Sequence, residues 1–136
     1  VGASEGAHDN GVGEQDDVRA AIEYLSNLGI EQPDLAGYSF GAWVNAMGLT
    51  SYAQVDRVVM VSPPVGFLDF DELKPNDKIK LVIVGSRDDI AQAELVKNAI
   101  PRWNPEASLK IIEGADHFYI SKTGELKAVI GEFLNG

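Results

Sequence analysis

Three residue types that together can carry out acyl transfer each follow a short apolar run of this sequence: a serine, an aspartate and a histidine. Ser39 lies at the centre of Gly37-Tyr38-Ser39-Phe40-Gly41, which fits the pattern G-x-S-x-G. A serine hydroxyl is a weak nucleophile at neutral pH, so it needs a neighbouring base to take its proton. His117 and Asp88 are our candidates for that base and for the acid that orients it. These residues predict nucleophilic catalysis at Ser39.

The G-x-S-x-G segment stands where an apolar strand is followed by a helix, which is typical of a nucleophile elbow. Such a tight turn strains the serine backbone, and small flanking residues let the neighbouring chain pass. We therefore expect both Gly37 and Gly41 to be required for steric reasons. The turn also places Ser39 at a helix N-terminus. There, the backbone N–H of Phe40 and the helix dipole would stabilise an oxyanion.

The elements that must position these residues alternate between strands and helices. Apolar runs predict strands at residues 33–38, 58–61, 81–84 and 109–112. Helical periodicity predicts helices at residues 14–29, 41–49, 92–100 and 124–134, the third of them ended by Pro101, and residues 1–13 read as a loop. Strands that alternate with helices indicate a parallel sheet covered on both faces. The predicted fold class is therefore α/β.

The three candidate catalytic residues follow three different predicted strands, the first, third and fourth. In an open parallel sheet the carboxyl ends of the strands meet at one edge, so we expect Ser39, Asp88 and His117 to come together there. His117 would take the serine proton and later return it to the leaving group. Asp88 would hold the imidazole in the required tautomer and stabilise its charged form.

Asp89 and Asp116 are alternatives to Asp88 as the acid. The pattern Gly85-Ser86-Arg87-Asp88 favours Asp88. We expect Asp89 to face solvent or to cap the helix that follows.

Aromatic residues flank the predicted catalytic edge. Among them we expect Phe67 and Phe118 to contact the substrate, with ordinary core or loop packing as the alternative for both. The segment 62–74 is too short for a large lid, so access to Ser39 should be open.

Composition limits the range of partners. The 136 residues, 45% of them hydrophobic, indicate one domain over residues 1–136 with its own core. The formal charge is −10 and the eleven basic residues are scattered, which argues against nucleic acid and anionic membranes as partners. Cysteine is absent, and no apolar run approaches the roughly 20 residues that span a bilayer. We expect a cytoplasmic protein.

Cofactor motifs are weak. The acidic and histidine group His8, Asp9, Glu14 and Asp17 matches neither zinc nor calcium spacing, so a solvated loop is the better interpretation. The segment Gly11-Val12-Gly13 lacks the third glycine and the preceding strand of a dinucleotide fingerprint. We expect neither a metal nor an organic cofactor.

The segment Gly37–Gly41, together with Asp88, His117 and their strands, resembles the carboxyl-terminal half of the α/β-hydrolase fold, which orders these residues as Ser, Asp and His. The opening VGASEGAHDNGVGEQDDVRAAIEYL resembles a small uncharacterised bacterial branch near dienelactone hydrolases and esterases. The resemblance covers essentially the whole sequence. It implies a parallel sheet flanked by helices that lacks the amino-terminal strands of the fold.

The same resemblance implies further strands before this point, with a loop among them that supplies a second oxyanion donor beside Phe40. Because the sequence contains neither, we expect a bare outer edge on the strand before Ser39, unless a homodimer partner or a missing amino-terminal segment covers it. The implied activity is that of a serine hydrolase acting on small carboxylic esters or related acyl substrates through an acyl-enzyme. An acyltransferase or perhydrolase with the same residues, or a catalytically silent fragment or interaction module, are the alternatives.

Overall fold

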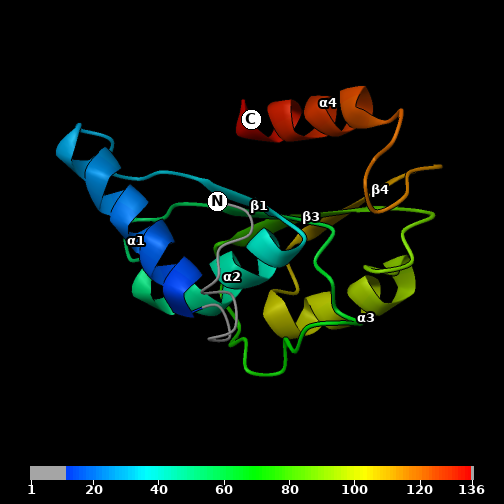
Figure 1. Cartoon of the computed structure of the whole chain (residues 1–136), viewed down its shortest axis with the longest axis horizontal. Helices are drawn as coiled ribbons and strands as arrows, with labels where there is room; N and C mark the ends of the chain where they lie inside the picture. The colour runs from blue at the N-terminus through cyan, green and yellow to red at the C-terminus, as the bar shows by residue number, and fades with distance from the viewer. Residues whose placement is uncertain (1–11, 136) are drawn as a thin grey trace.

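A four-stranded parallel sheet forms the centre of the molecule (Figure 1). The computed structural model describes residues 12–135, so the predicted opening loop up to residue 11 lies outside the described residues. The strands are β1 (Leu35–Tyr38), β2 (Val58–Val61), β3 (Ile79–Gly85) and β4 (Ser108–Ile112), and they are adjacent in chain order. The register pairs Tyr38 with Val61 and Val61 with Ile83, so the loops after the strands open at the same edge.

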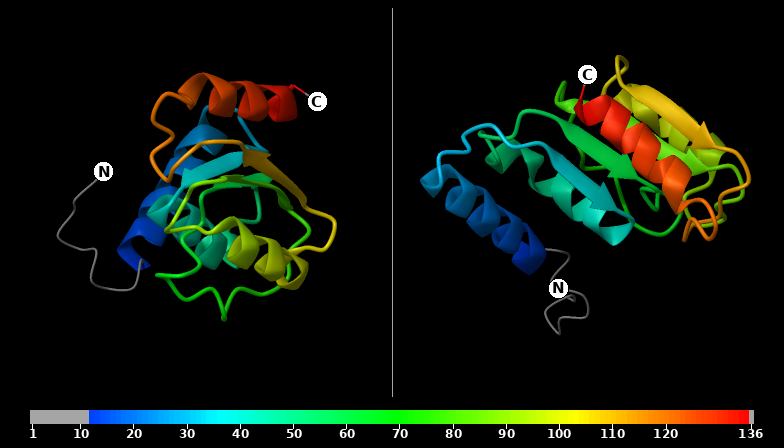
Figure 2. Two further views of the ribbon diagram at one scale, coloured as in Figure 1. Left: turned by 90° about the vertical axis from the view of Figure 1, so that its right-hand side faces the viewer. Right: turned by 90° about the horizontal axis from the view of Figure 1, so that it is seen from above.

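Helices cover both faces of this sheet, as the sequence predicts (Figures 1 and 2). On one side lie α2 (Phe40–Gly48) and α3 (Ala93–Trp103), with α1 (Val12–Asn27) packed beside α2. On the other side lies α4 (Thr123–Leu134). A short 3₁₀ turn, η2 (Leu49–Ser51), follows α2. Within the described part of the chain, no helix is both long and apolar enough to cross a lipid bilayer.

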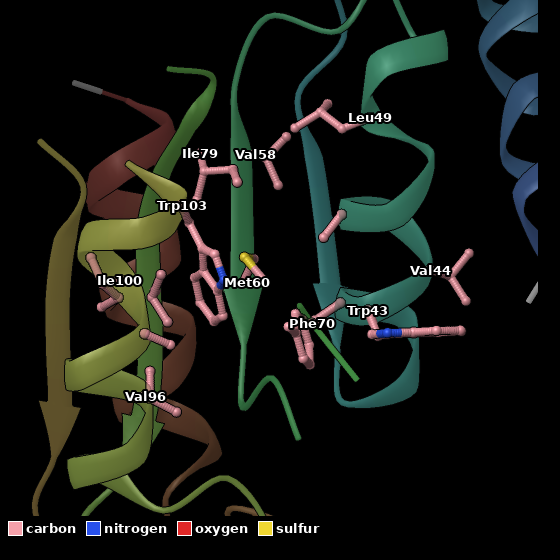
Figure 3. Close-up of a cluster of buried hydrophobic side chains, with 14 of the residues drawn as sticks. Trp43, Val44, Leu49, Val58, Met60, Phe70, Ile79, Val96, Ile100 and Trp103 are labelled. Atoms are coloured by element: carbon pink, nitrogen blue, oxygen red, sulfur yellow. The ribbon is translucent and has the colours of Figure 1, made fainter. Parts of the chain in front are cut away.

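The sheet separates two apolar clusters because its central strands are apolar on both faces. In β2, Val58 and Met60 belong to the larger cluster beneath α2 and α3, and Val59 and Val61 belong to the smaller cluster beneath α4. Figure 3 shows the larger cluster, in which Trp103 lies near Met60. Burial on both faces explains the continuous apolar runs and holds the strand ends in fixed positions.

Helix α3 continues through Pro101, so the predicted helix end at this proline is wrong. Proline removes one backbone donor and crowds the preceding turn, which disfavours a helix interior. Here the last turn is closed by the Asn104 N–H, which donates to the Ile100 carbonyl at 2.9 Å. Trp103 is only 1% exposed, and its ring packs 5.2 Å from that of Phe70. The burial of Trp103 outweighs the local preference of proline.

Candidate active site

Ser39 forms the single-residue junction between β1 and α2. Its backbone has φ 55° and ψ −117°, a left-handed conformation that is uncommon for a residue with a side chain. Its N–H donates to the Val61 carbonyl at 2.8 Å, and its own carbonyl accepts the Ala42 N–H at 2.9 Å. The serine therefore ends the sheet pairing and begins the helix within one residue. This is the strained turn that the G-x-S-x-G pattern predicts.

The two glycines of the pattern differ in what they do. A Cβ at Gly37 would lie 2.6 Å from Nδ2 of Asn45 and 2.7 Å from the carbonyl oxygen of Gly41, so this position accepts only glycine without rearrangement. A Cβ at Gly41 would meet no heavy atom within 4 Å in the region that the structure describes. The predicted steric role of Gly41 is therefore wrong. The Gly41 backbone is what approaches Gly37 closely, and a side chain at Gly41 itself would have room.

A continuous chain of hydrogen bonds joins Ser39, His117 and Asp88. Oγ of Ser39 lies 2.8 Å from Nε2 of His117. Nδ1 of His117 lies 3.0 and 2.9 Å from the two carboxylate oxygens of Asp88. His117 and Asp88 are both buried, being 4% and 5% exposed. The three side chains that the sequence predicts at one sheet edge are thus brought together, although they come from loops after three different strands.

Backbone donors hold the Asp88 carboxylate in place. Its Oδ1 accepts the N–H of Ile90 at 2.9 Å and that of Ala91 at 2.7 Å. Because the carboxylate faces Nδ1 of His117, it favours the tautomer that carries its proton on Nδ1. The lone pair of Nε2 is then directed at Ser39, which is the arrangement a general base requires.

The two alternative acids lie elsewhere. Asp89 is exposed, and Gln92 is the residue that caps α3. Asp89 therefore faces solvent and does not cap the helix. Oδ1 of Asp116 accepts the N–H groups of Phe118 and Ile120, both at 3.1 Å. Asp116 therefore shapes the turn around His117, and Asp88 is the residue that contacts the imidazole.

The predicted binding residues lie in different surroundings. Phe40 is the first residue of α2, where helix geometry leaves the backbone N–H without an intrahelical partner. Phe118 is 65% exposed, and its ring stands edge-on to His117 with the centroids 5.4 Å apart. Phe67 is 71% exposed and belongs to the turn after Pro64. Among the described residues, no ring contact or side-chain hydrogen bond joins Phe67 to the Ser39–His117–Asp88 chain.

Two tyrosines beside the hydrogen-bonded chain have contacts that the sequence does not predict. The Tyr38 hydroxyl donates to the backbone carbonyl of His117 at 2.7 Å. The Tyr119 hydroxyl lies 2.7 Å from Oγ of Ser62, and burial raises the pKa of Tyr119 to about 12 despite the opposing effect of the Ser62 hydrogen bond. Tyr38 stands inside the G-x-S-x-G segment, so the motif draws attention to it. Its hydrogen-bond partner is 79 residues away in the sequence, and only the fold brings the two residues together.

In residues 12–135, no group of three or more histidine or acidic side chains is arranged to hold a metal ion. His8 and Asp9, which the sequence placed in the weak metal motif, lie outside the described residues.

The parallel sheet and its flanking helices have the architecture of the α/β-hydrolase fold, and the comparisons with known proteins agree. A protein of unknown function from Agrobacterium tumefaciens, described as a candidate α/β hydrolase, superposes with a TM-score of 0.86 and 27% identity. A Xanthomonas campestris member of the α/β serine hydrolases, described as having no lid, superposes with a TM-score of 0.82 and 29% identity. An uncharacterised protein of Rickettsia prowazekii is 35% identical over 144 aligned residues. No family model matches the chain.

These relatives are longer than the chain. The alignments include 99%, 97% and 98% of this chain but only 65%, 60% and 60% of the Agrobacterium, Xanthomonas and Rickettsia proteins. The chain therefore corresponds to a portion of the α/β-hydrolase fold, as the sequence resemblance implies.

Proposed function

We propose that this chain carries the catalytic residues of a serine hydrolase that cleaves small carboxylic esters or related acyl compounds through an acyl-enzyme on Ser39. The observation that carries the proposal is the hydrogen-bond chain from Asp88 through His117 to Ser39. Its geometry is that of a nucleophile, a general base and an orienting acid. The likeness to a serine hydrolase of Xanthomonas campestris supports the same chemistry.

The proposed reaction has two steps. In the first, Nε2 of His117 takes the Ser39 proton as Oγ attacks the acyl carbon, and the imidazolium then donates that proton to the departing alcohol. In the second, water gives a proton to Nε2 as it attacks the acyl carbon, and the imidazolium then returns that proton to the departing Oγ of Ser39, which releases the acid and restores the serine. Asp88 stabilises the imidazolium in both steps from a fixed, buried position.

The backbone N–H of Phe40 is the oxyanion donor that we propose for both steps. It begins α2 directly after Ser39, so the helix dipole adds to its effect. The family resemblance implies a second donor from a loop that residues 1–136 do not contain. Loss of one such donor lowers turnover by about 10² to 10³. We therefore expect residues 1–136 alone to acylate at Ser39 but to turn over slowly.

Phe118 and Phe67 are the residues that we propose contact the acyl substrate. Phe118 is the better supported, because it is exposed and stands against the imidazole that acts on the substrate. The segment between β2 and β3 is short, and Phe70 within it is buried in the core rather than extended over Ser39. Among the described residues no large lid covers Ser39, and such an open site suits small substrates.

The free edge of β1 suggests a further partner. Within the described sheet β1 pairs only with β2, and a groove of about 340 Å³ lies beside it, lined by Ala36, Tyr38 and Phe118 among others. We infer that another strand pairs with this edge, which would remove an exposed row of backbone groups. The additional length of the relatives is one source of such a strand, and a second copy of this chain is the other. Sedimentation at several concentrations separates them, because only a homodimer dissociates on dilution.

Labelling with a fluorophosphonate tests the proposed function directly. We expect mass spectrometry to find the adduct on Ser39, and Ser39→Ala to abolish it. Ser108→Ala is the matched control, because Ser108 is exposed at the opposite end of β4. A folded chain that stays unlabelled would instead support the silent interaction module. Adding alcohols or hydrogen peroxide to an ester assay distinguishes an acyltransferase or perhydrolase, because these acceptors would then compete with water.

A further inference from the structure

Tyr38 links the strand that precedes Ser39 to the loop that carries His117. It is the last residue of β1 and directly precedes Ser39. Its side chain lies on the α4 side of the sheet, where it lines the 340 Å³ groove together with Leu126 and Ile130. From there it reaches the loop that carries His117, far away in the sequence.

The hydroxyl of Tyr38 binds the main chain of His117 rather than its ring. It donates to the His117 carbonyl at 2.7 Å, and the two rings lie 5.4 Å apart at an angle of 35°. Among the described residues, no backbone N–H donates to this carbonyl. The hydrogen bond from Tyr38 therefore fixes the backbone of the general base to the strand that ends at the nucleophile.

The loop that carries His117 depends on such anchors because its backbone is not regular. Gly114, Tyr119 and Ser121 all have positive φ, at 83°, 55° and 62°. Contacts to the ends of other strands also tie this loop to the sheet. The Arg87 N–H after β3 donates to the Ala115 carbonyl at 2.8 Å, and Tyr119 pairs with Ser62 after β2. The contact from Tyr38 supplies the corresponding tie to β1.

We propose that Tyr38 is a positioning residue, whose hydroxyl sets the distance between His117 and Ser39. This inference rests on the proposed roles of those two residues. Because Tyr38 and Ser39 are consecutive, a movement of the elbow carries the histidine loop with it and preserves the 2.8 Å contact between Oγ and Nε2. Displacement of a catalytic group by about 1 Å costs about 10²-fold in rate, so an anchor of this kind matters to catalysis.

The surroundings of Tyr38 keep its hydroxyl a donor. Burial raises the pKa of Tyr38 above its ordinary value, and the negative charges of Asp88 and Asp116 raise it further. The hydroxyl thus stays protonated over the whole range in which an imidazole titrates. The bond to His117 is consequently present whichever charge state the histidine adopts.

Tyr38→Phe tests the inference, because it keeps the ring and removes only the hydroxyl. Tyr52→Phe is the matched control: its hydroxyl also donates to a backbone carbonyl, that of Gln15 at 3.1 Å, but it joins α1 to the turn after α2. The readout is the ¹⁵N resonance of Nε2 of His117, which reports the hydrogen bond to Ser39. The chain has two histidines, so His8→Gln assigns the signal.

We expect Tyr38→Phe to shift the Nε2 resonance and to slow fluorophosphonate labelling of Ser39 by about tenfold or more. Tyr52→Phe should change neither. An unchanged resonance and labelling rate in folded Tyr38→Phe would overturn the inference. If the parent chain itself is not labelled, the proposed function fails, and the resonance alone still decides whether Tyr38 positions His117.

A second replacement covers the case in which Tyr38→Phe does not fold. Site-specific 3-fluorotyrosine at position 38 keeps the hydroxyl but makes it more acidic, and therefore a stronger hydrogen-bond donor to the His117 carbonyl. We expect it to move the Nε2 resonance of His117 without changing the midpoint of thermal unfolding. A resonance identical to that of the parent chain would count against the role of Tyr38.

Discussion

Both carboxylate oxygens of Asp88 lie within hydrogen-bond distance of Nδ1 of His117, at 3.0 and 2.9 Å. The backbone N–H groups of Ile90 and Ala91 also donate to Oδ1 of this carboxylate. The aspartate therefore cannot rotate away from the imidazole without losing several contacts. This relationship makes the identity of the acid testable.

Asp88→Asn should lower ester turnover by about 10³- to 10⁴-fold, because an amide that donates to Nδ1 selects the tautomer whose Nε2 already carries a proton. Asp89→Asn is the matched control and should leave turnover unchanged, since Asp89 is exposed. Steady-state kinetics with p-nitrophenyl acetate measure both variants. Equal losses in the two variants would show that Asp88 has no special role.

Gly37→Ala should lower the free energy of unfolding by about 1 to 3 kcal/mol, because the new methyl group overlaps Asn45 and the Gly41 backbone. Gly41→Ala should instead be neutral or stabilising by up to about 1 kcal/mol, since it adds a better helix former in α2 where there is room. Urea unfolding compares the two variants. A Gly41→Ala chain as unstable as Gly37→Ala would contradict the geometry of the elbow.

Tyr119 should make the folded chain sensitive to alkaline pH. Its pKa is about 12 when folded and 10.0 in an ordinary setting, so the folded state keeps a proton that the unfolded state loses first. The contribution of Tyr119 to the free energy of unfolding is complete below pH 10 and is lost as the pH rises toward 12. At pH 11.5 the free energy of unfolding should be lower by up to about 2 kcal/mol. Urea unfolding at pH 9 and 11.5 measures the loss. Tyr119→Phe should lack this component, and an identical pH slope in both chains would refute it.

Phe118→Ala should reduce kcat/KM for esters with bulky acyl groups by about 5- to 30-fold, because it removes roughly 1 to 2 kcal/mol of apolar contact. The effect should be much smaller for acetate esters, which do not extend to this side chain. Ile120→Ala is the control, since Ile120 is equally exposed on the same loop at 68%. If both variants lose the same activity, Phe118 acts on the loop and not on the substrate.

The sequence predicts the sheet well where burial is strong and local. Residues 58–61 and 81–84 are apolar at every position because they are buried on both faces, and no other interpretation fits their length. Pro101 misled the prediction of α3 because the decisive energy is the burial of Trp103 against Phe70, a contact between distant segments. The same limit applies to Gly41, whose freedom depends on what surrounds the helix.

The three central residues of the candidate site could be predicted from the sequence, but the tyrosines that support them could not. Ser39, Asp88 and His117 could be predicted because each lies in the segment that follows a predicted strand, and parallel strands end at one edge. The hydroxyl contacts of Tyr38 and Tyr119 could not, because tyrosine is equally common in cores and on surfaces, and nothing nearby in the chain marks their partners. Nor do the residues indicate which acyl group is cleaved, since substrate choice depends on the shape of the site.

The coincidence of strand order with chain order has a consequence for biosynthesis. As the polypeptide leaves the ribosome, β1 can pair with β2 and then β3 with β2, so the elbow at Ser39 forms against a growing sheet. The imidazole arrives last, after β4 has joined the edge. Under the proposed function, a nascent chain therefore carries an unactivated hydroxyl at Ser39 until the rest of the sheet is in place.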